Sequence, residues 1–282
     1  GDDAAVIDIG GDDYILFAAD GIWARLIEAS MWWAGYSSVL VNVNDIVAMG
    51  GKPVAMVNIL SSSNEKASHE LLRGIRDGVA KFGVPMVGGH LHPDTPYTSL
   101  SVAIIGTVKK GCEVKSSTAR PGDSVIAAFD MVGRLGPNSP YSFDSTTMKK
   151  PEEVREKYRV MQTLAEKHLL TAGKDISNPG VIGTLGMLVE TSRVGARVDL
   201  AKIPVPKDVD FTQWLKVHPA TGFIVTSLVE YEKEVIRQFE DAGYIAAGIG
   251  LIEDSHKLDI CLKDECVTVF DFSTDVVTGI TK

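Results

Sequence analysis

The chain has 282 residues, of which 45% are hydrophobic, and its 28 Lys and Arg against 37 Asp and Glu give a net charge of −9. This length can bury a full core in one large or two medium domains. The acidic balance argues against a nucleic-acid-binding surface, which is usually rich in clustered Lys and Arg. An acidic protein can still bind an anionic nucleotide if divalent cations lie between the two.

The longest apolar stretch, residues 39–57, is interrupted by four polar residues: Asn42, Asn44, Asp45 and Lys52. A transmembrane helix needs about 20 predominantly apolar residues, so we expect no membrane span. No secretory signal pattern is present, and because the chain does not begin with Met, we expect a segment upstream. We therefore expect a cytoplasmic protein with neither nucleic acid nor membrane as a partner.

The three cysteines are odd in number and lack the paired spacing of zinc ligands: Cys112, Cys261 and Cys266. Structural disulfides are rare in the cytosol. We expect all three to be ordinary residues of a reducing compartment.

Hydrophobic periodicity in the first half predicts alternating strands and helices. The predicted elements are a strand at 14–19, a helix at 37–49, a strand at 54–60, a helix at 65–82, and strands at 84–87 and 100–108. Gly50 and Gly51 should end the first helix, and Ser63 or Asn64 should cap the second, which Gly83 ends.

The turn-rich residues 118–123 mark the predicted domain boundary, which gives domains at 1–118 and 119–282. A polar loop at 130–150 is long enough to be functional or mobile. The predicted elements beyond the boundary are strands at 124–129, 196–199, 223–226 and 245–251, helices at 151–170, 181–193, 211–215 and 231–241, and a hairpin at 258–270. Such mixing predicts a two-domain α/β or α+β protein.

Acidic residues stand at turns in the first half, with glycines beside several of them. Asp2 and Asp3 are adjacent, Asp20 precedes Gly21 after an apolar run, and Asp45 precedes Gly50-Gly51. Carboxylates suit Mg²⁺, and glycine backbone can closely approach phosphates. The set predicts a magnesium–polyphosphate site, although an acidic terminal turn and a common Asp-Gly turn remain alternative explanations for its first members.

Polar residues within the helix at 37–49 also indicate a ligand. Asn42, Asn44 and Asp45 interrupt an otherwise apolar helix, and buried polar groups need partners. Gly88-Gly89-His90 follows a short apolar stretch and either turns the chain or forms part of a site. His90, His92 and Asp94 are close enough to suggest a metal site, although a lone His is usually structural.

The segment from Asp175 to Gly180 precedes a predicted helix, whose free N–H groups favour a phosphate. Capping of that helix by Ser177 or Asn178 is the competing explanation.

Taken in chain order, these motifs resemble the PurM-like superfamily of aminoimidazole ribonucleotide (AIR) synthase, thiamine-monophosphate kinase and selenophosphate synthetase. The matching stretches are Gly1-Asp2-Asp3-Ala4-Ala5, Ala19-Asp20-Gly21, Asn44-Asp45-Ile46, Ala48-Met49-Gly50-Gly51-Lys52-Pro53, Gly88-Gly89, Arg120-Pro121-Gly122-Asp123 and Lys174-Asp175-Ile176-Ser177. Trp32-Trp33-Ala34-Gly35-Tyr36 and the run from Gly89 to Tyr97 are most similar to AIR-synthase-related proteins known as methanogenesis markers in archaea.

The resemblance implies a homodimer whose N-terminal domains pair into a β-barrel, with ATP and Mg²⁺ in a cleft between the two domains of each subunit. It implies magnesium ligands at Asp2, Asp3, Asp20 and Asp45. It implies cofactor-binding residues at Gly21, Asn42, Asn44, Gly50, Gly51, Gly88, Gly89 and Ser177. It implies catalytic roles for Asp45, Asp175 and His90.

The activity that the resemblance implies is ATP-dependent phosphoryl transfer to a small molecule, or activation of that molecule by phosphorylation. The chain departs from the kinase pattern at His90, where a carboxylate is expected, and at Asn178. A Gly-Gly-His run is similar to selenophosphate synthetases, and on that resemblance Asp94 would supply the missing acid. A nucleotide-binding regulatory or assembly module without turnover, or a selenophosphate-synthetase-like or thiamine-monophosphate-kinase-like activity, remain the alternatives.

Overall fold

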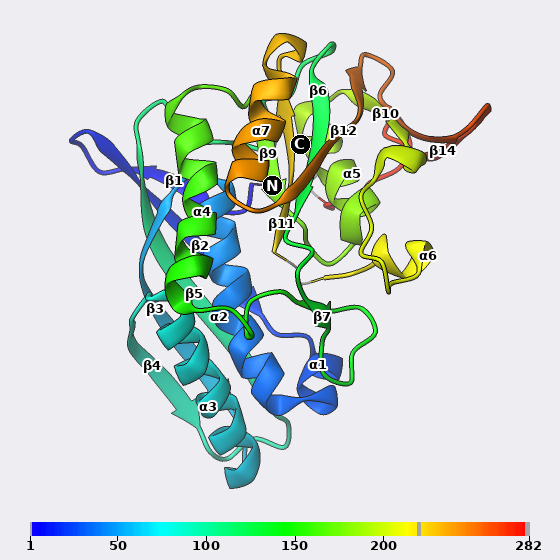
Figure 1. Ribbon diagram of the computed structural model, residues 1–282. Coiled ribbons are helices and arrows are strands. Elements are labelled where there is room, and N and C mark those ends of the chain that lie inside the picture. Colours follow the sequence, from blue (N-terminus) through cyan, green and yellow to red (C-terminus); the bar gives the residue numbers. More distant parts are fainter. Residues whose placement is uncertain (1, 219–220, 280–282) are drawn as a thin grey trace.

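The first half of the chain forms a five-stranded sheet with helices on one face, as the computed structural model of residues 2–218 and 221–279 shows (Figure 1). In sheet order the strands are β1 (Ala5–Asp8), β2 (Asp13–Gly21), β5 (Ser99–Lys109), β3 (Lys52–Ser61) and β4 (Met86–His92). The helices are α1 (Ala24–Ala29), α2 (Met31–Ala48) and α3 (Glu65–Phe82). Because α2 packs directly on β2, β3 and β5, it forms the centre of this half.

Local signals explain α3 and its contact with α2. The Asn64 side chain accepts a hydrogen bond from the backbone N–H of Ala67 at 3.1 Å, and Gly83 ends the helix in the left-handed conformation, φ 72°. Both features were predicted. A Cβ at Gly74 would lie 2.0 Å from the carbonyl oxygen of Trp32, so the small residue lets α3 approach α2 closely.

The second half forms a seven-stranded sheet with helices on both faces. In sheet order its strands are β14 (Glu265–Asp271), β13 (Lys257–Leu262), β10 (Gly195–Asp199), β12 (Ile245–Glu253), β6 (Ser124–Phe129), β11 (Gly222–Ser227) and β9 (Ala172–Asp175). The helices are α4 (Pro151–Glu166), α5 (Gly180–Ser192), α6 (Phe211–Trp214) and α7 (Glu232–Asp241), with 3₁₀ turns at Leu200–Lys202 and Val229–Tyr231. Within the described part of the chain, no helix is both long enough and apolar enough to cross a bilayer.

Strand β6 connects two hydrophobic cores because its side chains alternate between the faces of the sheet. Ile126 and Ala128 belong to the core that α2, α3, α4 and α7 share, whereas Val125, Ala127 and Phe129 pack with α5. The shared core fixes the first half of the chain against the second, so residues from both halves can form one rigid site.

Several features differ from the predictions, and the first is that helix α2 begins at Met31 rather than at 37. Strand β4 extends to His92, so Gly88, Gly89 and His90 lie within a strand rather than at a turn, and α4 ends at Glu166 rather than near 170. Strands β1 and β9 and helix α1 were not predicted. The segment 130–150 is anchored by short strands β7 (Arg134–Leu135) and β8 (Phe143–Asp144).

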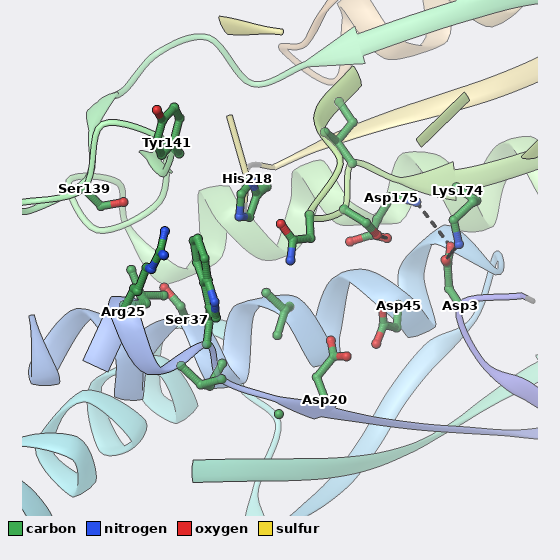
Figure 2. Close-up of a pocket in the computed structure, with 18 of the residues that line it drawn as sticks. Asp3, Asp20, Arg25, Ser37, Asp45, Ser139, Tyr141, Lys174, Asp175 and His218 are labelled. Carbon is green, nitrogen blue, oxygen red and sulfur yellow. Dashed lines mark hydrogen bonds and ion pairs between the residues drawn. The ribbon is translucent and has the colours of Figure 1, made fainter. Parts of the chain in front are cut away.

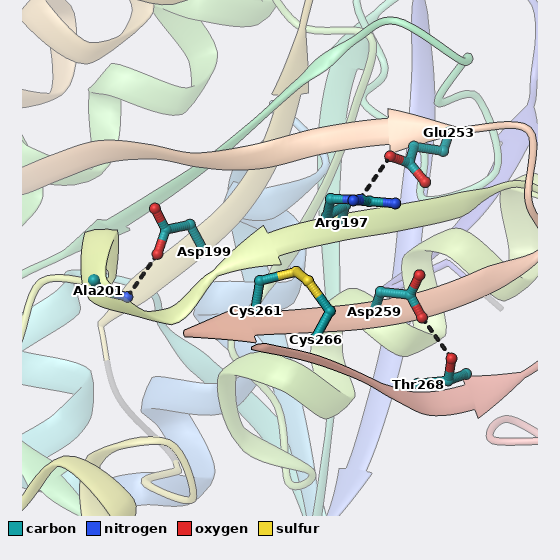
Figure 3. Close-up of a disulfide and its surroundings, with 8 residues drawn as sticks. All are labelled: Arg197, Asp199, Ala201, Glu253, Asp259, Cys261, Cys266 and Thr268. Carbon is teal, nitrogen blue, oxygen red and sulfur yellow. Dashed lines mark hydrogen bonds and ion pairs between the residues drawn. A yellow bond between two sulfur atoms is a disulfide. The ribbon is translucent and has the colours of Figure 1, made fainter. Parts of the chain in front are cut away.

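The cysteine prediction was wrong for two of the three residues. Cys261 and Cys266 face each other across the β13–β14 hairpin and form a disulfide, with a Cα–Cα distance of 4.1 Å (Figure 3). Cys112 is a free thiol. The pairing follows from the register of the hairpin, which brings the two residues opposite each other at adjacent strand positions.

The face of the first sheet opposite α2 is apolar and exposed. Phe17 lies beside Ile105 across the β2–β5 pair, and the two are 47% and 39% exposed. On β3, Val57 and Ile59 are 44% and 54% exposed. Among the described residues, no helix packs on this face.

Candidate functional site

A cavity of about 630 Å³ lies between the two halves of the chain. Its first wall comes from the segment before β1, the end of β2, and helices α1 and α2. Its second wall comes from residues 138–141, the segment joining β9 to α5, and His218. Figure 2 shows carboxylates gathered at one end of this cavity and aromatic and basic side chains at the other.

Three carboxylates converge at the acidic end. Asp3 precedes β1, Asp45 lies on α2 and Asp175 is the last residue of β9, and one oxygen of each lies within 4.8 Å of the others. Asp20, near the end of β2, lines the same end of the cavity. Carboxylate oxygens at this spacing fit a hard divalent cation such as Mg²⁺.

Hydrogen bonds and an ion pair hold Asp3 and Asp175 in position. The Asp3 carboxylate forms an ion pair with Lys174, and both side chains are 3% exposed. It also accepts the backbone N–H of Asp175 at 3.2 Å, while the Ser177 hydroxyl donates to the Asp175 carboxylate at 3.0 Å. A cation would therefore meet ligands that are already positioned.

Burial makes the ionised forms of these acids costly. It raises the pKa of Asp45 well above its ordinary value, and the nearby carboxylates of Asp175 and Asp20 raise it further. Burial, followed by the charge of Asp3, raises the pKa of Asp175 to about 7. Burial also raises the pKa of Asp20. Burial opposes the charge of Lys174, but the neighbouring carboxylates outweigh it and raise the pKa of Lys174.

The charges at this end do not balance. With four acids ionised against one lysine, the net charge is −4 + 1 = −3 (Asp3, Asp20, Asp45, Asp175 and Lys174). Uncompensated buried charge is unfavourable, and a divalent cation offsets most of it. The donor set thus fits magnesium by both ligand type and charge.

Seven of the residues that the sequence analysis selected line this cavity. They are Asp2, Asp3, Asp20, Gly21, Asp45, Asp175 and Ser177. Asp2 is held by hydrogen bonds from the backbone N–H and hydroxyl of Ser116, at 2.6 and 2.7 Å. The competing explanation for the segment before α5, capping by Ser177 or Asn178, is not seen, because the N-cap residue is Pro179 and no side-chain hydrogen bond caps the helix.

The asparagines of α2 lie elsewhere, inside the protein core. The Asn44 carbonyl accepts a hydrogen bond from the Tyr158 hydroxyl of α4 at 2.7 Å, and the Asn42 amide donates to the carbonyl of Ser38 at 2.9 Å. Both asparagines are fully buried and neither lines the cavity.

The two glycine pairs also lie away from the cavity. Gly50 and Gly51 follow the C-terminal end of α2, where a Cβ on Gly50 would lie 2.6 Å from the Cβ of Ala165. Gly88, Gly89 and His90 lie on β4, an edge strand that β3 and β5 separate from β2. The His90 ring contacts that of His92, with centroids 4.3 Å apart.

The residues at the opposite end of the cavity were not predicted from the sequence. Trp23, Arg25, Tyr141 and His218 line it, and they come from three separate segments. None belongs to a recognisable motif. The one available signal was the position of Trp23 and Arg25 within four residues of Gly21.

The fold and this cleft define a two-domain α/β protein with a carboxylate-rich cation site between its halves. AIR synthase related protein, N-terminal domain, matches residues 1–108, and the C-terminal domain of the same family matches residues 120–263. The chain therefore belongs to the AIR synthase related protein family, a PurM-like group.

Three similar proteins set the context. The uncharacterized protein MJ0640 of Methanocaldococcus jannaschii is 49% identical over 99% of this chain and 86% of its own. A selenide, water dikinase of Colwellia psychrerythraea is 25% identical over 72% of this chain and 60% of its own. The structure of T. maritima PurL complexed with ATP superposes with a TM-score of 0.83 at 19% identity, covering 96% of this chain and 45% of that one.

Proposed function

We propose that this protein is an ATP- and Mg²⁺-dependent enzyme that transfers a phosphoryl group to a small molecule, or activates that molecule by phosphorylation. The convergence of Asp3, Asp45 and Asp175 within 4.8 Å, in a cavity between the two halves, carries the proposal. The names of two similar proteins support it, since one is a dikinase and the other was solved with ATP.

In this proposal the acids of the cavity hold Mg²⁺ against the phosphates of ATP, with Asp45 and Asp175 central and Asp2, Asp3 and Asp20 beside them. The bound ion neutralises charge on the phosphate oxygens during transfer. Lys174 keeps Asp3 in place, and Gly21 and Ser177 border the nucleotide.

The predicted residues outside the cavity would act indirectly. Asn44 holds α2 to α4 through Tyr158, and α2 carries Asp45. Asn42, Gly50 and Gly51 would likewise shape the pocket by fixing α2. Within one subunit, no contact of Gly88, Gly89 or His90 with the cavity supports a role in binding or catalysis.

Calorimetry with AMPPCP, an ATP analogue that resists cleavage, tests the cation-dependent part of the proposal. We expect the protein to bind the analogue with Mg²⁺ and to lose at least about tenfold in affinity with EDTA, because the uncompensated acids repel a triphosphate. Asp45→Asn should weaken binding by a similar factor. The matched control is Asp13→Asn, an exposed change at the start of β2 outside the cavity.

Turnover of ATP distinguishes an enzyme from a nucleotide-binding module without activity. Release of ADP from ATP in the presence of a cell extract, abolished in Asp45→Asn, supports phosphoryl transfer. Tight binding of Mg·ATP with unchanged ATP across a broad set of acceptors would favour a regulatory or assembly module, which the departure at His90 motivates. Nucleotide binding that depends on neither Mg²⁺ nor Asp45 would contradict both the enzyme and the binding-module proposals.

We also propose that the protein is a homodimer that pairs through the exposed face of the first sheet. That face carries Phe17, Val57, Ile59 and Ile105, each between 39% and 54% exposed. A contiguous apolar sheet face of this kind usually marks an interface. Pairing two such faces would bury these side chains in a barrel-like core.

A further inference from the structure

The end of the cavity opposite the acids has a chemistry of its own, which the proposed binding of Mg·ATP does not use. Trp23, Arg25, Tyr141 and His218 line it. In Figure 2, Arg25 and Tyr141 lie on the side of the cavity away from the carboxylates. Trp23 is 47% exposed and Tyr141 is 43% exposed, so both rings are open to a ligand.

Arg25 is a cation without an acidic partner at this end. Only two of the described residues lining the cavity, Lys174 and Arg25, carry a permanent positive charge, and Lys174 is paired with Asp3. No described carboxylate forms an ion pair with Arg25. Its guanidinium instead lies 5.2 Å from the centre of the Trp23 ring, a cation–π contact that restrains the group while leaving its N–H donors available.

His218 adds a neutral wall to this end. Burial lowers its pKa, so the ring carries no charge near pH 7. Its Nδ1 lies 3.0 Å from the carbonyl oxygen of Lys216 and must donate to it, because a carbonyl only accepts. The ring centre lies 6.2 Å from that of Trp23, at an angle of 42°, and the His218 backbone N–H donates to the Tyr141 carbonyl at 2.5 Å.

Two aromatic faces, one neutral imidazole and one available guanidinium suit a planar group that bears a negative charge. Arginine matches carboxylate and phosphate oxygens through paired N–H donors. The nucleoside part of ATP is uncharged. An unpaired cation at this end therefore has more to gain from a second, anionic molecule than from adenosine.

We infer that the Trp23–Arg25 end of the cavity binds the second substrate, and that this substrate is a planar or unsaturated small molecule with a carboxylate or phosphate group. Its anion contacts Arg25, its ring lies against Trp23 and Tyr141, and its reacting oxygen points along the cavity toward the acids. The inference rests on the proposed function, because it takes the acidic end to be the site of Mg·ATP.

Phenyl phosphate and benzoate, with benzyl alcohol as the uncharged comparison, are suitable probes in calorimetry against protein saturated with Mg·AMPPCP. We expect millimolar binding of the two anions, as befits fragments of this size, and at least tenfold weaker binding of benzyl alcohol. Arg25→Met should lower the affinity for the two anions by about tenfold or more. It should change the affinity for Mg·AMPPCP by no more than about twofold. Trp23→Leu should weaken both aromatic anions.

Arg73→Met is the matched control, because Arg73 is an exposed residue of α3 that pairs with Glu70 outside the cavity. Equal binding of the anions to wild type and Arg25→Met, or no binding to wild type at about 10 mM, overturns the inference. An equal loss of nucleotide affinity in Trp23→Leu overturns it too, since the base of ATP would then occupy this end. Arg25-dependent anion binding in a protein that fails to bind Mg·AMPPCP supports this subsite and refutes the proposed function instead.

Discussion

Replacing Asp175 by asparagine should stabilise the metal-free protein. Asp175 is 4% exposed, and burial together with Asp3 raises its pKa to about 7 from 3.8 in a model peptide. The folded state therefore holds a proton on Asp175 between about pH 4 and pH 7 that the unfolded chain has released. Stability falls as the pH rises through that window and stays low above it.

The magnitude follows from the size of the pKa change. A rise of about 3 units corresponds to at most about 4 kcal/mol at pH 8, at about 1.4 kcal/mol per unit. Asparagine keeps the oxygen that accepts from Ser177 and carries no charge, so Asp175→Asn should recover much of this energy. For a chain of this size, that gain corresponds to an increase in Tm of several degrees, up to roughly 10 °C.

Differential scanning calorimetry in EDTA provides the assay, at pH 8 and again at pH 4.5. The Asp175→Asn variant should melt above wild type at pH 8, and the difference should shrink at pH 4.5, where Asp175 is protonated in the native wild-type protein. Mg·AMPPCP at about 100 times its Kd should stabilise wild type by about 2.7 kcal/mol and the variant by much less. A variant that melts at or below the temperature of wild type in EDTA at pH 8 would refute this prediction, because ionised Asp175 would then not destabilise the metal-free protein.

Three further perturbations test other parts of the structure. Val57→Lys should convert the dimer into a monomer, as measured by light scattering after gel filtration. The control Val229→Lys changes a 57% exposed valine outside the sheet and should leave the dimer intact. A dimer that persists in Val57→Lys would contradict the proposed interface. Lys174→Met leaves Asp3 buried without its cation, so the free energy of chemical unfolding in EDTA should fall by about 3 kcal/mol. Adding Mg²⁺ should restore part of this stability. An unchanged unfolding midpoint would argue against the ion pair. Cys266→Ser removes a hairpin disulfide with a sequence separation of 5, so the free energy of unfolding should fall by at most about 2 kcal/mol. Three reactive thiols in the untreated native protein would show that the disulfide is absent.

Much of the acidic site could be read from the sequence because its members stand at recognisable places. Asp20 ends an apolar strand beside a glycine, and Asp45 interrupts an apolar helix. Helix α3 was equally clear, since Asn64 and Gly83 mark its two ends. Such signals are local. The expectation that these residues meet in one cleft came from the order of the motifs along the chain, which resembles that of a known family.

The features that the structure places differently from the sequence-based expectation depend on contacts between distant residues. The polar side chain of Asn44 indicated a ligand, yet its partner is Tyr158, which is 114 residues away on α4. Gly88 and Gly89 looked like a turn, but parallel pairing with β3 draws them into a strand. Only the register of a hairpin reveals that Cys261 faces Cys266, because composition alone indicated a reducing compartment.

The opposite end of the cavity could not be predicted for the same reason. Arg25 and His218 line the same cavity although they are nearly two hundred residues apart in the chain. A cation becomes informative only when the structure shows that no acid accompanies it.

A crystal structure of the protein with Mn²⁺ and AMPPCP would test the central claim most directly, because manganese replaces magnesium among oxygen ligands and gives an anomalous signal. We predict an anomalous peak about 2.2 Å from carboxylate oxygens of Asp45 and Asp175, bridged to the phosphates of the analogue. A peak elsewhere, or a nucleotide bound outside the cavity between the two halves, would contradict the account.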